Sequence, residues 1–448
     1  MGIIEKIAAA GVVGCGGAGF PTHRKLSGDI QYFIVNGAEC EPLLRTDRYI
    51  MLHEAPALVK AIQAIADELN IPNCVIAVKH HYEEEITSLR KAISEADAAI
   101  TIHELGSFYP AGDEQTIVYE VTGRIVPPAG LPISVGAVVD NVGTVFAISE
   151  ALKGIPFTHK YVTVTGEVRH PVILRVPIGT SIQYCLELAG GAKSDDYFIV
   201  TGGPMMGRPV SRENLDDAVV TKTTSAILVL PGDGLHARTQ QISIQHMLNR
   251  ARSACIQCTS CTQLCPRHLL GHPLEPHRIM RKMAICDSIQ TLLKDPYIQN
   301  AALCCECGVC EIYACPMGLQ PRKINAMIKQ ELGKAGVRYQ APANMTWKAS
   351  EDREIRKVPS ERLAARAGVR KYYHYNIKEL LVGEPQRVEI PLKMHIGNPA
   401  QAVVAVDDYV QTGDIIAAVP ENALGAAVHA SISGRVKYVG DRIVLVKE

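Results

Sequence analysis

Eight of the 14 cysteines form two groups between residues 255 and 315, and their spacing is that of metal ligands. Each group has three cysteines separated by two residues, then a fourth cysteine followed by a proline. Three residues precede the fourth cysteine in the first group, and four precede it in the second. Three closely spaced thiolates suit three corners of a 4Fe–4S cube, and in two-cluster proteins the fourth cysteine of each run binds the other cube. The spacing therefore predicts two 4Fe–4S clusters, one held by Cys255, Cys258, Cys261 and Cys315 and the other by Cys304, Cys307, Cys310 and Cys265.

Zinc and disulfide bonds are the alternatives for these cysteines. Four-cysteine zinc sites usually pair two C-x2-C hairpins, and a third cysteine at the same short interval in both groups does not suit a tetrahedral ion. Disulfides need an oxidising compartment, and we find no signal peptide leading to one. Cys305 is an additional thiol that does not fit the spacing. The pattern therefore favours an iron–sulfur electron carrier.

Size and charge set the frame around these clusters. The length of 448 residues corresponds to about three or four domains. Lys plus Arg equals Asp plus Glu, 46 against 46, so no nucleic-acid partner is indicated. The longest apolar stretches are interrupted before the roughly 18 residues that a membrane span needs. We expect a cytoplasmic protein with no direct membrane span.

The hydrophobic pattern changes along the chain. Near-continuous apolar runs such as 32–35 and 75–78 alternate with helical stretches, as in a parallel sheet covered by helices. Alternating strands follow, then helices around the cysteines, a polar stretch and finally short strands between turn residues. We expect an α/β domain over 1–155, a β-grasp domain over 156–238, a helical double-cluster domain over 239–336, a linker over 337–385 and an all-β barrel-sandwich module over 386–448.

A glycine-rich loop lies near the N-terminus, over residues 11–22. Such a loop can bring backbone N–H groups close to a phosphate with no side chains in the way. It is not the dinucleotide fingerprint, because no strand precedes it and its glycine register is poor. Ordinary turns also contain glycine clusters, so the loop alone is weak support for a cofactor.

The loop, followed by Lys25, resembles the FMN-binding loop of the flavin-carrying NADH subunit of respiratory complex I. Residues 36–42, 109–114 and 140–144 resemble that family's other three flavin segments, in the same order. Residues 161–191 resemble its soluble-ligand-binding β-grasp module. The resemblance implies bound FMN and NADH as the electron donor. Ala38 and Gly143 stand where complex I carries acids.

The same resemblance implies roles for single residues. The loop glycines would approach FMN, a lysine would neutralise its phosphate, and three polar side chains would hydrogen-bond it: Gly14, Gly16, Gly17, Gly19, Lys25, Asn36, Asn141 and Thr144. An aromatic ring would stack on the nicotinamide or adenine, and acidic residues would lie at the cofactors: Phe20, Glu39, Glu41 and Glu114. A core aromatic is the alternative for Phe20, and a solvated loop is the alternative for Glu39 and Glu41.

The double cysteine pattern behind a flavin region is similar to two families, the C subunit of the Rnf complex and the PduS-type cobalamin reductases. Rnf C subunits begin with a lipoyl-like barrel-sandwich module. Here the matching segments, 403–417 and 425–434, lie at the C-terminus, which resembles PduS. This implies electron transfer from NADH through FMN and both clusters to cobalamin, with an adenosyltransferase as a partner. An Rnf C-like subunit that feeds a membrane complex or another flavoprotein is the alternative.

The first ten residues have Ile3, Ile4 and Ile7 on one face. This pattern predicts a short amphipathic helix. It would either target the protein to a bacterial microcompartment, with shell proteins as partners, or pack against the flavin domain.

Overall fold

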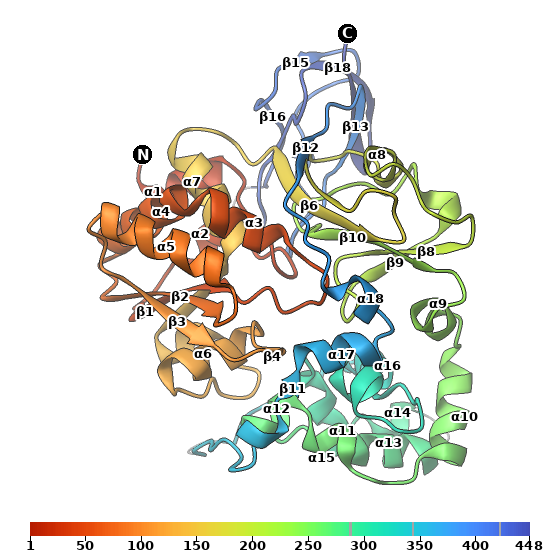
Figure 1. Ribbon diagram of the computed structural model, residues 1–448. Helices are drawn as coiled ribbons and strands as arrows, with labels where there is room; N and C mark the ends of the chain where they lie inside the picture. Colours follow the sequence, from red (N-terminus) through yellow and green to blue (C-terminus); the bar gives the residue numbers. More distant parts are fainter. Residues whose placement is uncertain (286–288, 343–344, 421–422) are drawn as a thin grey trace.

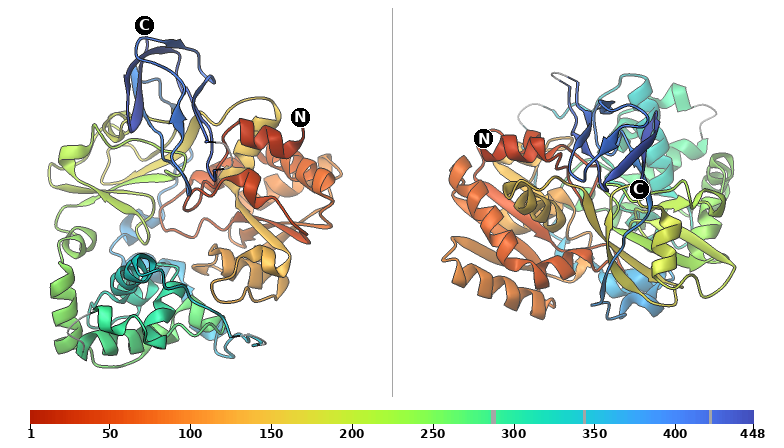
Figure 2. Two further views of the ribbon diagram at one scale, coloured as in Figure 1. Left: turned by 180° about the vertical axis from the view of Figure 1, so that it is seen from behind. Right: turned by 90° about the horizontal axis from the view of Figure 1, so that it is seen from above.

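The computed structural model describes every residue except 286–288, 343–344 and 421–422. Four parts are visible in Figure 1. The N-terminal α/β domain lies beside a β-grasp sheet, with the helical cysteine region at one end and the C-terminal barrel at the other. Both views of Figure 2 show the barrel against the α/β domain and the β-grasp sheet.

The α/β domain is built on a parallel sheet of order β3-β2-β1-β5. Its strands are β1 (Tyr32–Gly37), β2 (Asn73–Lys79), β3 (Ile100–Leu105) and β5 (Ala137–Asn141). Its helices are α1 (Ile3–Ala9), α2 (Thr22–Lys25), α3 (Thr46–His53), α4 (Ala55–Leu69), α5 (Glu83–Glu95), α6 (Glu114–Thr122) and α7 (Val142–Leu152).

Successive residues of a strand point to opposite faces, and β1 shows the consequence. Phe33 and Val35 pack into the apolar cluster that contains α1, α4 and α7, whereas Ile34 packs with Ile117 of α6. Both faces of the sheet are therefore buried, which explains the continuous apolar runs. The polar residues at the strand ends remain available at the carboxyl edge, where α/β proteins bind ligands.

The β-grasp part is a six-stranded sheet of order β12-β7-β6-β10-β8-β9 packed on helix α8 (Ile182–Leu188). Its strands are β6 (His159–Gly166), β7 (Val172–Pro177), β8 (Tyr197–Thr201), β9 (Arg208–Val210), β10 (Ala226–Pro231) and β12 (Leu380–Val382). Strand β12 comes from the region that we expected to be a linker. Another short strand of that region, β11 (Val358–Pro359), pairs with β4 (Phe108–Tyr109). Residues 337–385 are therefore built into two other parts of the molecule.

The cysteine region is helical. Its main helices are α9 (Leu235–Gln240), α10 (Ile244–Ala254), α11 (Ser260–Gln263), α12 (Pro266–Leu269), α13 (Pro276–Ile285), α14 (Ile289–Leu292), α15 (Pro296–Gln299) and α16 (Pro321–Lys334), and a π-helical turn spans Val309–Tyr313. Ile279 and Met283 of α13 pack against Ile324 and Ile328 of α16 in one apolar cluster. This cluster also includes Cys265 and Cys304, so the region's core lies directly against cysteine ligands.

The C-terminal module consists of two small antiparallel sheets. One contains β13 (Arg387–Pro391), β15 (Tyr409–Val410), β18 (Gly434–Val439) and β19 (Arg442–Val446); the other contains β14 (Gln401–Ala402), β16 (Ile415–Ala418) and β17 (Val428–His429). Ile390 and Ile443 belong to the same apolar cluster as residues of the α/β domain. The module is therefore packed onto the flavin region.

The N-terminal helix α1 uses its apolar face inside the molecule. Ile3 and Ile7 are buried against the α/β domain, and both carboxylate oxygens of Glu68 accept from the Ile3 N–H. Of the two interpretations of this helix, packing against the flavin domain is the one that the structure bears out. In the part of the chain that the structure describes, no helix is long and apolar enough to cross a membrane.

Candidate flavin and iron–sulfur sites

The glycine-rich loop presents open backbone at the carboxyl edge of the sheet. Its conformation is held by the Cys15 N–H, which donates to Thr144 Oγ1 at 2.9 Å. A Cβ added at Gly17 would meet nothing within 4 Å, whereas one at Gly16 would lie 3.0 Å from Asn141. The loop therefore has free space above Gly17 and a close approach to Asn141, an arrangement that fits a phosphate or a flat ring on its backbone.

The four segments that resemble flavin-binding segments converge around this loop. Asn36, at the end of β1, donates to the carbonyl of Gly112 at 2.8 Å. Lys25 Nζ forms an ion pair with Glu114 at 2.8 Å and donates to the Val139 carbonyl. These contacts join the first segment to the third and fourth, and the second to the third. Lys25 thus lies where the resemblance puts the FMN phosphate, and it is already balanced by a carboxylate.

Asp47, at the start of α3, is a central residue that carries no motif in the sequence. Asn141 donates to its carboxylate at 2.6 Å, and the Asp47 N–H donates to Glu39 at 2.9 Å. Burial, with the adjacent Asp47, raises the pKa of Glu39 to about 7. Glu39 is therefore a buried carboxyl group at the N-terminus of α3, and the solvated-loop alternative does not describe it.

Glu41 occupies a different environment from the one expected of a residue facing a dinucleotide. Its carboxylate accepts from the backbone N–H groups of Met205 and Met206, each at 2.9 Å, and so joins the second flavin segment to a turn of the β-grasp sheet. Burial raises the pKa of Glu41 to about 7. Tyr109 Oη lies 3.4 Å from the same carboxylate and donates to the Cys307 carbonyl at 2.8 Å.

The C-terminal module covers the end of the glycine loop. The Ile396 N–H donates to the Gly19 carbonyl at 3.2 Å, and Gly19 has a φ of +74°, which favours glycine. Lys222 Nζ donates to the carbonyls of Gly11 and Ala427, each at 2.7 Å, and so joins three parts of the molecule. Phe20, next to Gly19, is half-buried.

The second cysteine set comprises Cys304, Cys307, Cys310 and Cys265, and all four are buried. Burial and then the neighbouring thiols of Cys304 and Cys265 raise the pKa of Cys310. The set therefore contains Cys265 from the first run, which is the exchange that the spacing implies.

Two contacts hold the second cysteine set against the flavin domain. Tyr109 bonds the Cys307 carbonyl, as described above. Arg267, two residues after Cys265, forms a bidentate pair with Asp113 at 2.6 and 2.9 Å, and Asp113 caps α6 through the Thr116 N–H. Neither contact was expected from the sequence.

The first cysteine set lines a pocket of its own, with Cys255, Cys258, Cys261 and Cys315 on its walls. Cys315 therefore comes from the second run. Cys258 is exposed and the other three are partly buried. This set lies on the side of the helical region that faces solvent, and exposed Ile256 and Met317 flank it.

Both sets offer four thiols, the donor set of a 4Fe–4S cluster. Among the described residues, no three His, Cys, Asp or Glu side chains are placed to hold a single metal ion. A cube binds its thiolates at four corners and so spaces them more widely than one tetrahedral ion does. The donor chemistry of both sets fits clusters.

Family models match along the chain in four ranges. They are the Nuo51 FMN-binding domain over 7–150, the SLBB domain over 161–209, a 4Fe-4S dicluster domain over 254–320 and the RnfC barrel sandwich hybrid domain over 373–448. These matches confirm the expected fold class, with an α/β flavin domain, a β-grasp module, a helical two-cluster domain and a barrel-sandwich module. They also confirm FMN and two 4Fe–4S clusters as the cofactors.

Curated relatives match almost the whole chain. Cobalamin reductase PduS of Salmonella typhimurium is 42% identical over 99% of this chain and 96% of its own length. Cobalamin reductase PduS of Citrobacter freundii is 40% identical over the same shares. A component of the proton-translocating ferredoxin:NAD(+) oxidoreductase complex of Clostridium ljungdahlii, its C subunit, is 36% identical over 60% of this chain and 56% of its own length.

Proposed function

The chain belongs to the family of the cobalamin reductase PduS, and from that premise we propose that it transfers electrons from NADH, through FMN and two 4Fe–4S clusters, to cobalamin. The observation that carries this proposal is the contact between the two cofactor regions. Tyr109, in the third flavin segment, donates to the carbonyl of Cys307, a ligand of the second cysteine set. The flavin segments and the cluster ligands thus form one continuous buried region.

The chain's own residues supply binding and orientation. The backbone around Gly17 is open to FMN, and Asn36 and Asn141 are fixed beside it by their bonds to Gly112 and Asp47. FMN, when bound, supplies the conversion between the two-electron chemistry of a nicotinamide and one-electron chemistry. Buried side chains around Cys307 and Cys310 exclude water from the second set.

NADH as the donor is supported by the type of flavin domain. The Nuo51 model covers residues 7–150, and the Clostridium relative, which matches 60% of the chain, is named as part of an NAD(+) oxidoreductase complex. The acceptor is supported by the full-length similarity to PduS. An adenosyltransferase that consumes the reduced corrinoid, and a location inside a bacterial microcompartment, follow from the same family membership.

Gly17→Glu tests this function together with the loop. The added side chain has room in the fold but occupies the space above the backbone. We expect this variant to keep its iron, lose FMN and lose NADH-driven reduction of hydroxocobalamin, measured by absorbance under anaerobic conditions. Gly17→Ala is the matched control and keeps both. Full FMN content in Gly17→Glu would contradict the assignment of the loop, and a flavin-loaded wild type that leaves cobalamin oxidised would contradict the proposed acceptor.

A further inference from the structure

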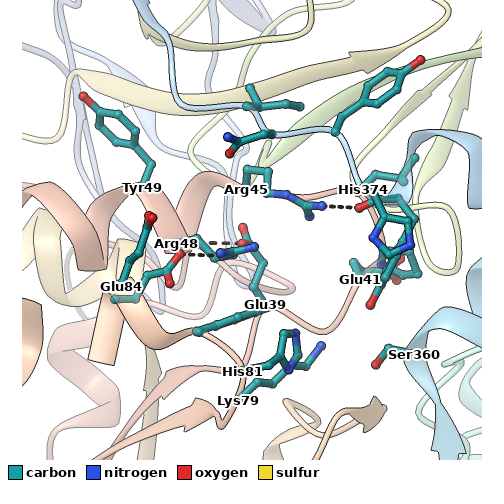
Figure 3. Close-up of a pocket in the computed structure, with 18 of the residues that line it drawn as sticks. Glu39, Glu41, Arg45, Arg48, Tyr49, Lys79, His81, Glu84, Ser360 and His374 are labelled. Atoms are coloured by element: carbon teal, nitrogen blue, oxygen red, sulfur yellow. Dashed lines mark hydrogen bonds and ion pairs between the residues drawn. The ribbon is translucent and has the colours of Figure 1, made fainter. Parts of the chain in front are cut away.

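A cavity of about 390 Å³ lies beside the flavin segments, at the carboxyl end of β2. It is bounded by α3, by the start of α5 and by residues 373–378, which cross it as a strap (Figure 3). The strap is fixed at both ends: Arg45 donates to the Tyr373 carbonyl, and Lys378 pairs with Glu84 at 2.7 Å. The cavity is separate from the glycine loop, whose residues do not line it.

Basic side chains of this cavity lack carboxylate partners. Lys79, the last residue of β2, is only 3% exposed, and it forms no hydrogen bond or ion pair with a described residue. Arg45 donates to the carbonyls of Leu44 and Tyr373, and it too has no ion pair within the described part of the chain. In Figure 3, Arg45 enters the cavity from one side and Lys79 from the other.

The acids around the cavity are committed elsewhere. Glu39 accepts from the backbone N–H groups of Asp47 and Arg48, and Glu85 pairs with the Arg48 side chain at 2.6 Å. A buried cation without a counter-ion is costly. An anionic ligand between Lys79 and Arg45 would remove that cost, and charge-assisted bonds to a phosphate suit both side chains.

The remaining walls suit an aromatic ring. Tyr82 is buried with the Arg48 guanidinium 4.3 Å from its ring centroid, and Tyr49 and Tyr373 also line the cavity. The volume lies near the lower end of the range for small-molecule sites. It suits a mononucleotide and is too small for a corrin macrocycle.

We propose that this cavity binds the phosphate-bearing nucleotide portion of a substrate, with Lys79 and Arg45 on the phosphate and tyrosine rings beside the base. The inference rests on the proposed function, which supplies two such molecules: the dinucleotide donor, and cobalamin, whose lower ligand is a nucleotide tail. Both present the same chemistry, a phosphate ester next to a ring.

Binding to the oxidised, fully loaded protein tests the proposal without turnover. The probes are ADP-ribose, hydroxocobalamin and cobinamide, which has the corrin ring but no nucleotide tail, and calorimetry gives the affinity for each. Lys79→Met removes the buried charge, Lys79→Arg keeps it, and Lys60→Met, on exposed α4 surface, is the matched control. FMN content and the unfolding temperature show whether each variant is folded.

We expect Lys79→Met to bind ADP-ribose or hydroxocobalamin on the order of ten- to a hundredfold more weakly, as for a lost charged hydrogen bond. Lys79→Arg should retain binding, and Lys60→Met should equal the wild type. Loss for ADP-ribose assigns the cavity to the donor. Loss for hydroxocobalamin with unchanged cobinamide assigns it to the corrinoid tail.

The proposal is overturned if Lys79→Met binds both nucleotides as the wild type does, or if the wild type binds neither. Loss of FMN with both affinities unchanged would also overturn it, because Lys79 would then serve the flavin. A chain that shows Lys79-dependent binding but does not reduce cobalamin would contradict the proposed function alone.

Discussion

The two cysteine sets have the same donor chemistry and very different surroundings. The second set is buried, and Tyr109 and Arg267 tie it to the flavin domain. The first set opens to solvent at Cys258, beside exposed Ile256. Solvent exposure and hydrogen bonds around the sulfurs tune an iron–sulfur cluster. A repeated ligand spacing therefore produces two unequal sites, and the difference comes from residues outside the repeat.

The largest expected effect comes from removing one ligand from each set. Cys310→Ala and Cys258→Ala should each leave about four of roughly eight irons in anaerobically prepared protein. Only Cys310→Ala should also lower the unfolding temperature strongly, because its site is part of the buried region against the flavin domain. Iron analysis and thermal unfolding measure both. Equal destabilisation by the two variants would break the comparison.

Arg267→Met tests the tie between the second set and the flavin domain. It leaves Asp113 buried without its partner, and loss of one member of a buried pair typically costs about 3–5 kcal/mol. The unfolding temperature should fall, while the exposed Arg281→Met should behave as the wild type. If Arg267→Met and Arg281→Met unfold at the same temperature, the ion pair does not hold these regions together.

A pH series sharpens the same comparison, because the flavin side contains buried Glu39. Its pKa is raised from 4.5 to about 7, first by burial and then by Asp47. A group whose pKa is higher when folded contributes stability that is full below about pH 4.5 and is lost as the pH rises through 7. The wild type should therefore lose about 1–3 kcal/mol relative to Glu39→Gln between pH 4.5 and 8. Parallel stability curves for the two proteins would refute this.

The smallest expected effect is that of Tyr109→Phe. It removes one hydroxyl bond to the Cys307 carbonyl, worth about 1 kcal/mol. The unfolding temperature should fall slightly, and the absorbance of the cluster region should change. Tyr119→Phe is the control, since the Tyr119 ring, and not its hydroxyl, contacts Arg353. A spectrum unchanged in Tyr109→Phe would show that the contact does not reach the second set.

Local patterns carried most of what could be predicted. The thiol spacing indicated both clusters because a cube's corners are matched by residues close together in the chain. The four flavin segments were recognisable because each combines small or polar residues at the end of a strand. The alternation of Phe33, Ile34 and Val35 between the two buried faces of the sheet likewise follows from the strand itself.

Contacts between distant residues were not predictable in this way. Arg267 and Asp113 are 154 residues apart, and neither belongs to a pattern that implies the other. Glu41 was expected at a dinucleotide, but it also meets the turn at Met205, which the sequence marked only as a turn. Lys79 reads as the end of an apolar strand, and only the fold shows that it is buried in a cavity without a counter-ion.

Single-turnover kinetics test the central claim most directly. Anaerobic, fully loaded protein is mixed with NADH and hydroxocobalamin, and flavin and corrinoid absorbance are followed together. We predict flavin reduction followed by formation of cob(II)alamin, with the second step lost in Cys304→Ala. Reduced flavin beside a corrinoid that stays oxidised, while a ferredoxin is reduced rapidly under the same conditions, would contradict the account.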